Sequence, residues 1–482
     1  MQIVPGTVDD PLESSSSPIT QGRLLDFPAD PARCMRRLHN EHGDIAALEE
    51  NGQRIIFVFG PHYNHEVLSD TQSYHSQFFP IRGPRNSAQR RLTSGLLNMN
   101  GDAHKRHRRM IAAPFQRSSI ANYQSGIADL AREMVWGWKA GETRDISREM
   151  NEFMLRVTSS LLFGFDQHGL AYEIGRATER WVTLNHQMGM GALVSDVGIT
   201  ELYTSLLEHA DELETRIRQM IALRRSSPPG HDVLSLLLQA RDENGAGMTD
   251  GELIGQAAVL FGAAHLTTAH TLTWALFLLS QHPRVATELV GELHGILDEA
   301  SPSIEQLEQL PLLGRVVKES MRVLPASAYS QRITSGPVQL GPLALQKGTV
   351  VVFSPLISHR LPELYAEPER FLPQRWKTLT PAPYSYIPFA SGPRLCIGSS
   401  LAMMTIKTTL PTILRRFRLS VVPDATIDAR VIATMLAPTS GVPMQISPAS
   451  SHFTAPPVTG SVHELVDLHT GEEVAQASRQ AA

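Results

Sequence analysis

Residues 389–398 are Phe389-Ala390-Ser391-Gly392-Pro393-Arg394-Leu395-Cys396-Ile397-Gly398. A cysteine stands here between two glycines and near an arginine, directly before a pattern that predicts a helix over 399–417. A cysteine at a helix N-terminus meets N–H groups and the positive end of the helix dipole, and both favour the thiolate. Glycines let the backbone run close beneath a flat cofactor, so that N–H groups can point at the sulfur. The stretch therefore predicts a thiolate that binds a metal.

The composition excludes several classes of protein. The chain has 482 residues, of which 42% are hydrophobic and 19% charged, so it can bury a large core. Its 43 Lys and Arg against 48 Asp and Glu give a net charge of -5, and we expect no nucleic-acid partner. Two cysteines are typical of a reducing compartment. The first residues show neither a signal peptide nor a membrane anchor, so we expect a cytoplasmic protein.

The patterns along the chain predict a mainly helical protein with a small β region. We expect residues 1–20 to form a flexible lead, 21–447 a single domain and 448–482 a polar, disordered tail. Strand-like runs at 45–48 and 54–59 flank Asn51-Gly52, a dipeptide that favours a tight hairpin. Helical patterns dominate from 103 to about 220 and return at 311–324, and a β-branched run predicts a strand at 349–353.

The segment 253–282 contains no Asp, Glu, Lys or Arg and is long enough to cross a bilayer. Two imidazoles in its middle, His265 and His270, would be costly at mid-bilayer, so we favour a helix buried in a large core. Thr249 and Glu252 fit a capping box at its start, and Pro283 ends it.

The cysteine stretch resembles the haem-binding signature of the cytochromes P-450, whose haem iron is held by a cysteine thiolate. The matching residues are Phe389, Gly392, Arg394, Cys396 and Gly398. The resemblance implies the P-450 fold around a buried haem b, with Cys396 as the iron ligand. The alternative, an inert buried cysteine in a turn, fits these five identities poorly. Cys34 has no such neighbours and is interpreted as incidental.

A second match concerns charged residues that would support the cysteine loop. Glu319 and Arg322 look like the Glu-x-x-Arg pair of the family, and Arg370 follows in the Pro-rich segment 368–376. Such a pair alone is weak evidence for the family, because an exposed i,i+3 contact on any helix has the same spacing. The apolar helix around it favours a buried charged triad that locks the cysteine loop.

A third match concerns the two carboxylates of haem, which need cationic partners when desolvated. The segment 101–109 is similar to the helix that supplies such contacts, with His104 and Arg108 one turn apart, and Arg332 and Arg394 stand where the family places two more donors. The alternative for His104 and Arg108 is an exposed basic helix. In either case the outward residues among Lys105, Arg106 and Arg109 are candidates to dock an acidic electron donor.

A fourth match lies at the middle of the uncharged segment. Residues 263–268 resemble the oxygen-activation segment of the family, with Val259, Ala263 and Thr267 on one stripe at i,i+4 spacing. The resemblance makes Thr267 the oxygen-side alcohol. The alternative is that its hydroxyl merely hydrogen-bonds a helix carbonyl.

The sequence departs from the family immediately before this alcohol. An acid usually stands there, but this chain has Leu266, and Ala264 replaces a glycine. Leucine cannot relay the protons that O–O cleavage requires. His265 lies about 100° around the helix from Leu266, so it replaces the acid only if the helix is distorted. We therefore keep three interpretations: a monooxygenase with protons routed through Thr267 and water or substrate, a P-450 that uses peroxide or performs another oxidation, and a poorly coupled enzyme.

The resemblance implies an enzyme that inserts one oxygen atom of O2 into an organic substrate, with electrons from a separate ferredoxin or flavodoxin and its reductase. We expect a monomer and a natural-product or lipid-like substrate. The candidate pocket residues are Val259, Ala263, Leu266, Met435 and Leu436, with further contributions from 78–96, 181–200 and 325–330. A haem-thiolate sensor or binding protein remains an alternative of another class.

Overall fold

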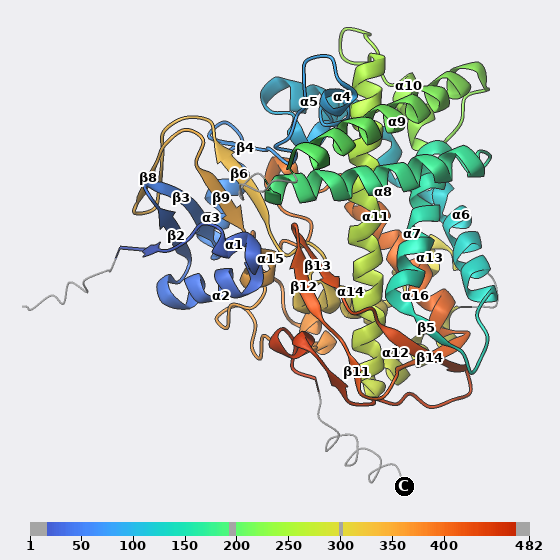
Figure 1. The fold of residues 1–482 in the computed structure, drawn as a ribbon. Coiled ribbons are helices and arrows are strands. Elements are labelled where there is room, and N and C mark those ends of the chain that lie inside the picture. Colours follow the sequence, from blue (N-terminus) through green and yellow to red (C-terminus); the bar gives the residue numbers. More distant parts are fainter. Residues whose placement is uncertain (1–16, 192–198, 298–301, 469–482) are drawn as a thin grey trace, which may run out of the picture.

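The computed structural model describes residues 17–191, 199–297 and 302–468 (Figure 1). The helices are α1 (Asp26–Ala29), α2 (Pro31–His42), α3 (Pro61–Ser69), α4 (Ala88–Leu92), α5 (Gly101–Met110), α6 (Arg117–Trp136), α7 (Ile146–Phe163), α8 (His168–Gly191), α9 (Ile199–Ser226), α10 (Val233–Gln239), α11 (Asp250–Gln281), α12 (Pro283–Ile296), α13 (Ile304–Glu308), α14 (Pro311–Val323), α15 (Pro355–Ser358) and α16 (Ser399–Leu414). The expectation of a mainly helical chain is confirmed.

A mixed six-stranded sheet lies to one side of the helices, with the order β1-β2-β3-β9-β6-β4 (Figure 1). Its strands are β1 (Ile19–Gln21), β2 (Ile45–Glu50), β3 (Gln53–Val58), β4 (Tyr74–His75), β6 (Ser330–Thr334) and β9 (Val350–Phe353). The β2–β3 hairpin turns at Asn51 and Gly52, whose φ angles are 52° and 80°. These positive angles match the turn predicted from the dipeptide.

Smaller sheets complete the fold. The strands β10 (Phe417–Val421), β14 (Pro443–Pro448) and β5 (Thr143–Asp145) form one, and the pairs β7 (Val338–Leu340) with β8 (Leu343–Leu345), β12 (Ala429–Ile432) with β13 (Met435–Pro438), and β11 (Ala425–Thr426) with β15 (Val458–Thr459) form the others. Short 3₁₀ turns are η1 (Leu96–Asn98), η2 (Ala113–Phe115), η3 (Pro373–Lys377), η4 (Gly392–Arg394) and η5 (Ser461–Glu464).

Helix α11 is the long helix predicted from the uncharged segment, and it runs through the middle of the helical region (Figure 1). The capping box at its start is present, because the Thr249 side chain accepts from the N–H of Glu252 and the Glu252 carboxylate accepts from the N–H of Thr249. Its 32 residues pack against α7, α8, α4, α14 and α16. Across the described residues, no helix has the length and apolar run that a membrane crossing requires.

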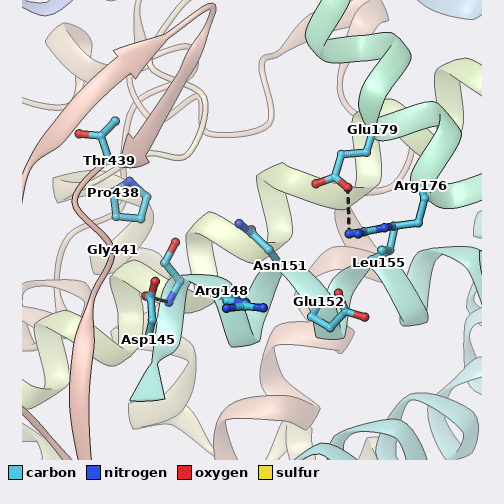
Figure 2. A pocket seen from close by; sticks show the side chains of 11 residues that line it. Asp145, Arg148, Asn151, Glu152, Leu155, Arg176, Glu179, Pro438, Thr439 and Gly441 are labelled. Atoms are coloured by element: carbon cyan, nitrogen blue, oxygen red, sulfur yellow. Dashed lines mark hydrogen bonds and ion pairs between the residues drawn. The ribbon is translucent and has the colours of Figure 1, made fainter. Parts of the chain in front are cut away.

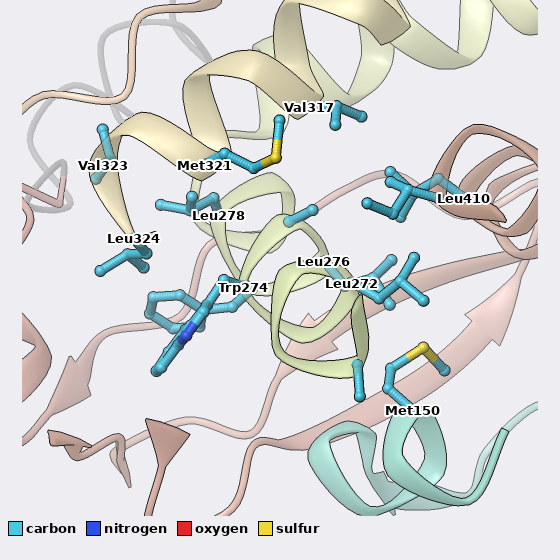
Figure 3. Packing of buried hydrophobic residues seen from close by; sticks show 14 of the residues in the cluster. Met150, Leu272, Trp274, Leu276, Leu278, Val317, Met321, Val323, Leu324 and Leu410 are labelled. Carbon is cyan, nitrogen blue, oxygen red and sulfur yellow. The ribbon is translucent and has the colours of Figure 1, made fainter. Parts of the chain in front are cut away.

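The core explains why α11 carries no charges. Figure 3 shows Leu272, Trp274, Leu276 and Leu278 of α11 reaching neighbouring helices in several directions, including Met321 of α14. A helix that is surrounded by other elements needs apolar side chains all round. The indole N–H of Trp274, the one polar group of this side chain, donates a hydrogen bond to the Leu436 carbonyl at 3.0 Å. Burial within this core, not within a membrane, therefore accounts for the composition of the segment.

The expectation of a disordered tail from 448 onward is wrong for residues 449–468. This segment, which we call the C-terminal strap, forms β15 and η5 and buries five apolar side chains against the main core: Val458, Val462, Leu465, Val466 and Leu468. The segment is polar in overall composition, so the sequence analysis did not recognise that its apolar residues could pack against the core. Residues 469–482 lie outside the described part of the chain, as do residues 1–16 of the expected lead, whose last residues already belong to β1.

The strap fastens segments that are distant in sequence. Its Leu465 carbonyl accepts from the buried guanidinium of Arg360 at 2.7 Å, and its Glu464 carbonyl accepts from Arg36 of α2 at 2.7 Å. Asp467 N–H donates to the Glu369 carbonyl at 2.9 Å. Burial lowers the pKa of Arg360 to about 9, and the charge of Arg322 adds to this effect. The strap thus supplies one of the carbonyls that compensate a buried cation.

Removing residues 449–482 should therefore destabilise the protein. Burying a large apolar side chain stabilises by about 1.5 to 3 kcal/mol, so losing five should lower Tm by roughly 5 °C or more. Thermal unfolding of this truncation, compared with a truncation of 469–482 alone, is the measurement. Equal Tm values for the two truncations would show that the strap does not contribute to stability.

Candidate functional site: a cysteine loop, a cationic cluster and a small-residue helix face

The cysteine loop is held in a compact turn. Cys396 N–H donates to the Phe389 carbonyl at 2.9 Å, and η4 lies between the two residues. Gly392 has φ +70°, and a Cβ at this position would come within 2.6 Å of the Leu68 carbonyl oxygen of α3. A side chain here would collide with the backbone, so this glycine is required by the close approach. The loop path is thereby fixed up to Cys396.

Cys396 presents its sulfur where a helix begins. Gly398 is the N-cap of α16, so its N–H lies near the Cys396 sulfur at the start of the helix. Although the residue is exposed, the crowded loop withholds water from the sulfur and raises the pKa of the Cys396 thiol; the Gly398 N–H and the charge of Arg108 act in the opposite direction. The thiol is thus neutral until a cation shares the site, and a bound metal ion deprotonates a coordinating thiol.

Four cationic or potentially cationic side chains gather near this loop: His104, Arg108, Arg332 and Arg394. Arg108 donates to the Leu395 carbonyl at 2.7 Å, which ties α5 to the cysteine loop. Arg394 donates to the Met99 carbonyl and to Asn100 Oδ1, both at 2.6 Å. The structure therefore brings together the four residues that the sequence analysis assigned to carboxylate binding.

The cluster lacks negative charge of its own. Within the described ranges, none of the four forms an ion pair with Asp or Glu, and Arg394 Nε is buried without a partner. Burial, followed by the charges of the three arginines, lowers the pKa of His104 to about 4. Burial and Arg394 lower the pKa of Arg332 to about 9. Buried cations without anions are costly, so the cluster fits a ligand with at least two carboxylates.

One face of α11 is covered only by small side chains. Ala263 is exposed although most of its helix is buried, and Thr267 retains partial exposure. The Thr267 hydroxyl donates to the Ala263 carbonyl at 2.8 Å, as the helix-bonded alternative anticipated. Its hydrogen is therefore engaged, while its oxygen lone pairs remain free to accept. Leu266 is half-buried, and α11 is a regular helix throughout, so no distortion brings His265 to the position of the acid.

The expected pocket residues do not all line a cavity. Ala263, Leu266 and Met435 keep exposed surface. Leu436 has none, because it packs in the main core beside Trp274, and Val259 is 3% exposed against Gly95. Leu436 and Val259 are therefore packing residues in this structure. Residues 192–198 of the expected 181–200 contribution lie outside the described chain.

Glu319 and Arg322 form a fully buried pair on α14. The guanidinium donates to both carboxylate oxygens, at 3.0 and 2.9 Å, and also to the carbonyls of His359, Pro368 and Arg370. Neither side chain has exposed surface. The pair is thus a structural clamp between α14 and the segment that leads to Cys396.

The expectation that the Arg370 side chain completes this triad is corrected by the structure. The second guanidinium on Glu319 is that of Arg375, with Nε at 2.9 Å, and the Trp376 indole donates at 2.8 Å. Arg370 contributes its carbonyl to Arg322, and its side chain pairs with Glu367. Arg375 and Trp376 lie in the same Pro-rich segment as Arg370, so the signal was present, but spacing alone did not identify which arginine turns inward.

His359 is a further contributor that the sequence analysis missed. Its Nε2 accepts from the N–H of Ile387 at 2.9 Å and so positions the start of the cysteine loop. Burial, with the charges of Arg322 and Arg360, lowers the pKa of His359 to about 3, which keeps the ring neutral and able to accept.

Together these features define a class of protein. A cysteine with exposed surface at a helix start, a cationic cluster without carboxylate partners and a small-residue helix face fit a porphyrin with thiolate-ligated iron. Cys396 would ligate the iron, and the four cationic residues would hold the two carboxylates. The structure is that of a haem-thiolate protein.

The comparisons with known proteins agree with this class. The family model "Cytochrome P450" matches residues 19–442. Cyclooctat-9-en-7-ol 5-monooxygenase of Streptomyces melanosporofaciens is 32% identical over 397 residues, which cover 80% of this chain and 84% of that protein. Pentalenene oxygenase of Streptomyces avermitilis is 29% identical over 356 residues, covering 72% and 78%. The chain belongs to the cytochrome P450 family, and it is an oxidoreductase of the monooxygenase type.

Solved structures give the same fold. The retinoic-acid-bound cyanobacterial CYP120A1 matches with a TM-score of 0.76 at 21% identity, over 88% of this chain and 96% of that one. The haem domain of cytochrome P450DA matches with a TM-score of 0.78 at 22% identity, over 89% and 96%. These likenesses concern the fold.

Replacing Glu319 by glutamine should release the cysteine loop. The substitution leaves the Arg322 charge buried without a carboxylate, which costs about 3 to 5 kcal/mol. We expect lower Tm and loss of the thiolate signature in the reduced, carbon-monoxide-bound absorption spectrum. Glu288→Gln, which removes an exposed pair with Arg284, is the matched control. A Glu319→Gln protein with the Tm and spectrum of the control would contradict the role of the clamp.

Proposed function

We propose that this chain is a monooxygenase that uses haem b and inserts one oxygen atom into a C–H bond of a terpene-like natural product. Two relatives are named for reactions on cyclooctat-9-en-7-ol and pentalenene, which motivates the substrate class. The observation that supports the haem cofactor is the unpaired cationic cluster beside the Cys396 loop, and the names of the relatives support the monooxygenase reaction. The exposed apolar surface of Ala263, Leu266 and Met435 suits a hydrocarbon body.

The residues of this chain would divide the work as follows. When bound, haem supplies the reductive activation of dioxygen. Cys396 would donate electron density to the iron, and the Gly398 N–H would tune that donation. The small, exposed side chain of Ala263 would leave room for the cofactor and for dioxygen. Thr267 offers its hydroxyl oxygen as an acceptor, because its hydrogen is engaged with the helix.

Leu266 limits this assignment because it cannot carry a proton. Protons must therefore pass through Thr267 with water or substrate, or arrive with peroxide as the oxidant. The peroxide-using enzyme is thus the second candidate, and the specific observation that favours it is Leu266 on the half-exposed face of α11.

Electrons would come from a separate ferredoxin or flavodoxin. Lys105 and Arg109 are well exposed on α5, with surface pairs to Asp102 and Glu243 that solvent weakens. Arg106 is not available for docking, because Asp242 and Glu252 hold it. We further propose a cytoplasmic monomer with a single haem domain. A sensor of the same fold would need the Cys396 loop and the cationic cluster without electron-driven turnover.

The test uses haem-loaded protein, a reduced ferredoxin system, isotopically labelled dioxygen and two probes, cyclooctat-9-en-7-ol and pentalenene. We expect at least one probe to perturb the haem absorption and to gain one labelled oxygen atom. Thr267→Ala should divert electrons from product to hydrogen peroxide. Binding of a probe without labelled product would favour the sensor, and product formed only with added peroxide would favour the peroxide-using enzyme.

A further inference from the structure

Helix α8 carries polar side chains at two places along its length. Near its middle, Arg176 and Glu179 pair at 3.8 Å beside a polar hollow of about 420 Å³ that α7 also borders (Figure 2). Farther along the helix, Trp181 and His186 contact residues of the segment 78–96, which the sequence analysis assigned to the substrate pocket. The second half of α8 is therefore the part that a substrate would meet.

Several polar groups in this half of α8 bond to one another. The Trp181 indole donates to Gln89 Oε1, and the Gln89 side-chain amide donates to Asn185 Oδ1, both at 2.7 Å. The Asn185 side-chain amide donates to the Trp181 carbonyl at 2.8 Å. All three side chains are buried, so the network fastens α8 to α4 and is satisfied within the chain. These residues need no ligand.

His186 differs from these residues because its imidazole is left without a polar partner. Its ring contacts the Phe78 ring with the centroids 6.5 Å apart, and among the described residues it forms no hydrogen bond or ion pair. Burial lowers the pKa of His186, and no charged group adds to this effect, so the ring is neutral. A neutral imidazole offers one N–H donor and one nitrogen acceptor. Leaving both unpaired in a buried place costs free energy.

The crossing of α8 over α11 places the His186 ring near the small-residue face of α11. Val182 lies directly against α11, because a Cβ on Gly262 would come within 3.2 Å of Val182 Cγ2. Gly262 immediately precedes the exposed Ala263. Val182 and His186 are four residues apart, so their side chains point to the same side of α8. His186 therefore lies one helical turn beyond the point where α8 touches this face.

Phe78 reaches the same place from another element. Its N–H donates to Asn98 Oδ1 at 2.6 Å, which holds it on η1. Gly95, the residue before η1, lies against α11, since a Cβ there would come within 2.6 Å of Val259 Cγ2. Val259 is one turn before Ala263 on α11. The ring contact between Phe78 and His186 thus joins η1 to α8 beside the small-residue face.

The exposed surfaces at this junction belong to one open space. Ala263 is exposed, and Phe78 and His186 are half-buried, although their neighbours Val182 and Phe79 are buried. Surface that stays exposed where three packed elements meet faces the space between them. The imidazole is a polar group in a wall that the other residues named here make apolar.

We propose that His186 binds a hydroxyl group on an otherwise apolar substrate and so orients that substrate over α11. A hydroxyl both donates and accepts, as the neutral imidazole does. A hydrocarbon would leave both ring nitrogens unpaired, and a carboxylate, which only accepts, would leave one unpaired. The proposal rests on the proposed function and narrows its substrate class to alcohols with an apolar skeleton.

Such an anchor would set the position of oxidation. Apolar packing alone has no preferred direction, so a hydrocarbon body can turn within its site. A hydrogen bond at one end removes part of this freedom and presents a fixed set of C–H bonds to the reacting centre. The C–H bonds that face Ala263 and Thr267 then depend on their distance from the bound hydroxyl. His186 would therefore act as a specificity-determining residue and take no part in the oxygen chemistry.

The first test measures binding to the haem-loaded protein with a matched pair of probes, cyclododecanol and cyclododecane. Dissociation constants are read from the change in haem absorption, so no turnover is needed. His186→Phe keeps a ring against Phe78 but has no polar atom. It should weaken binding of the alcohol by about fivefold or more and should not weaken binding of the hydrocarbon. His186→Gln keeps a donor and an acceptor and should retain most of the affinity for the alcohol.

The control is His209→Phe on α9. His209 is half-buried like His186, but its Nδ1 lies 2.7 Å from the Ser205 carbonyl of its own helix, so its ring is already bonded. This variant should leave both dissociation constants unchanged. The proposal is overturned if cyclododecanol does not bind, if His186→Phe weakens both probes equally or neither, or if His186→Gln loses as much affinity for the alcohol as His186→Phe.

The second test measures products from an equimolar mixture of cyclooctat-9-en-7-ol and pentalenene with the reduced ferredoxin system. His186→Phe should shift the product ratio toward pentalenene by about fivefold and should spread oxidation of the alcohol over more positions. An unchanged ratio and an unchanged position would overturn the proposal even if the protein oxidises both terpenes. A preference for cyclododecanol that depends on His186, without any oxidised terpene, would support the hydroxyl site and count against the proposed function instead.

Discussion

The carboxylate of Glu319 is the interaction on which the site depends. It has no exposed surface, and it accepts hydrogen bonds from Arg322, Arg375, the Trp376 indole and the Leu372 N–H. These donors come from α14 and from the segment before the cysteine loop, so one buried anion joins two parts of the chain. Arg322 then extends the network to three carbonyls. A charge this deeply buried is stable only when hydrogen bonds fill its acceptor sites. Loss of one donor should therefore displace the whole segment before the cysteine loop, with little room for a partial shift.

The same electrostatic logic explains why the chain fits its cofactor. The cationic cluster of His104, Arg108, Arg332 and Arg394 is left without anions, whereas the Glu319 clamp is compensated within the chain. Burial disfavours the charged forms of His104 and Arg332 until carboxylates arrive. Binding of the cofactor carboxylates would therefore offset the free-energy cost of burying these cations, which the folded chain alone does not offset.

Features that depend on neighbouring residues were predictable from the sequence. The Asn51-Gly52 turn, the Thr249 capping box and the cysteine loop are local patterns, and the structure contains each of them. Features that depend on the path of a loop were not predictable from the sequence. Spacing indicated an arginine for Glu319 but selected Arg370 over Arg375, and the polar composition after residue 448 concealed the strap. The departure at Leu266 was visible in the sequence, but only the structure showed that α11 is regular there and keeps His265 away from the position of the acid.

One measurement examines the thiolate ligation most directly. The haem-loaded protein is reduced and exposed to carbon monoxide, and its Soret band is compared with that of Cys396→His. Ligation through Cys396 predicts the long-wavelength Soret band typical of thiolate-bound haem in the unaltered protein, and its loss in the variant with haem retained. A fully loaded, unaltered protein without that band, or a variant that keeps it, would contradict the assignment of Cys396 as the iron ligand.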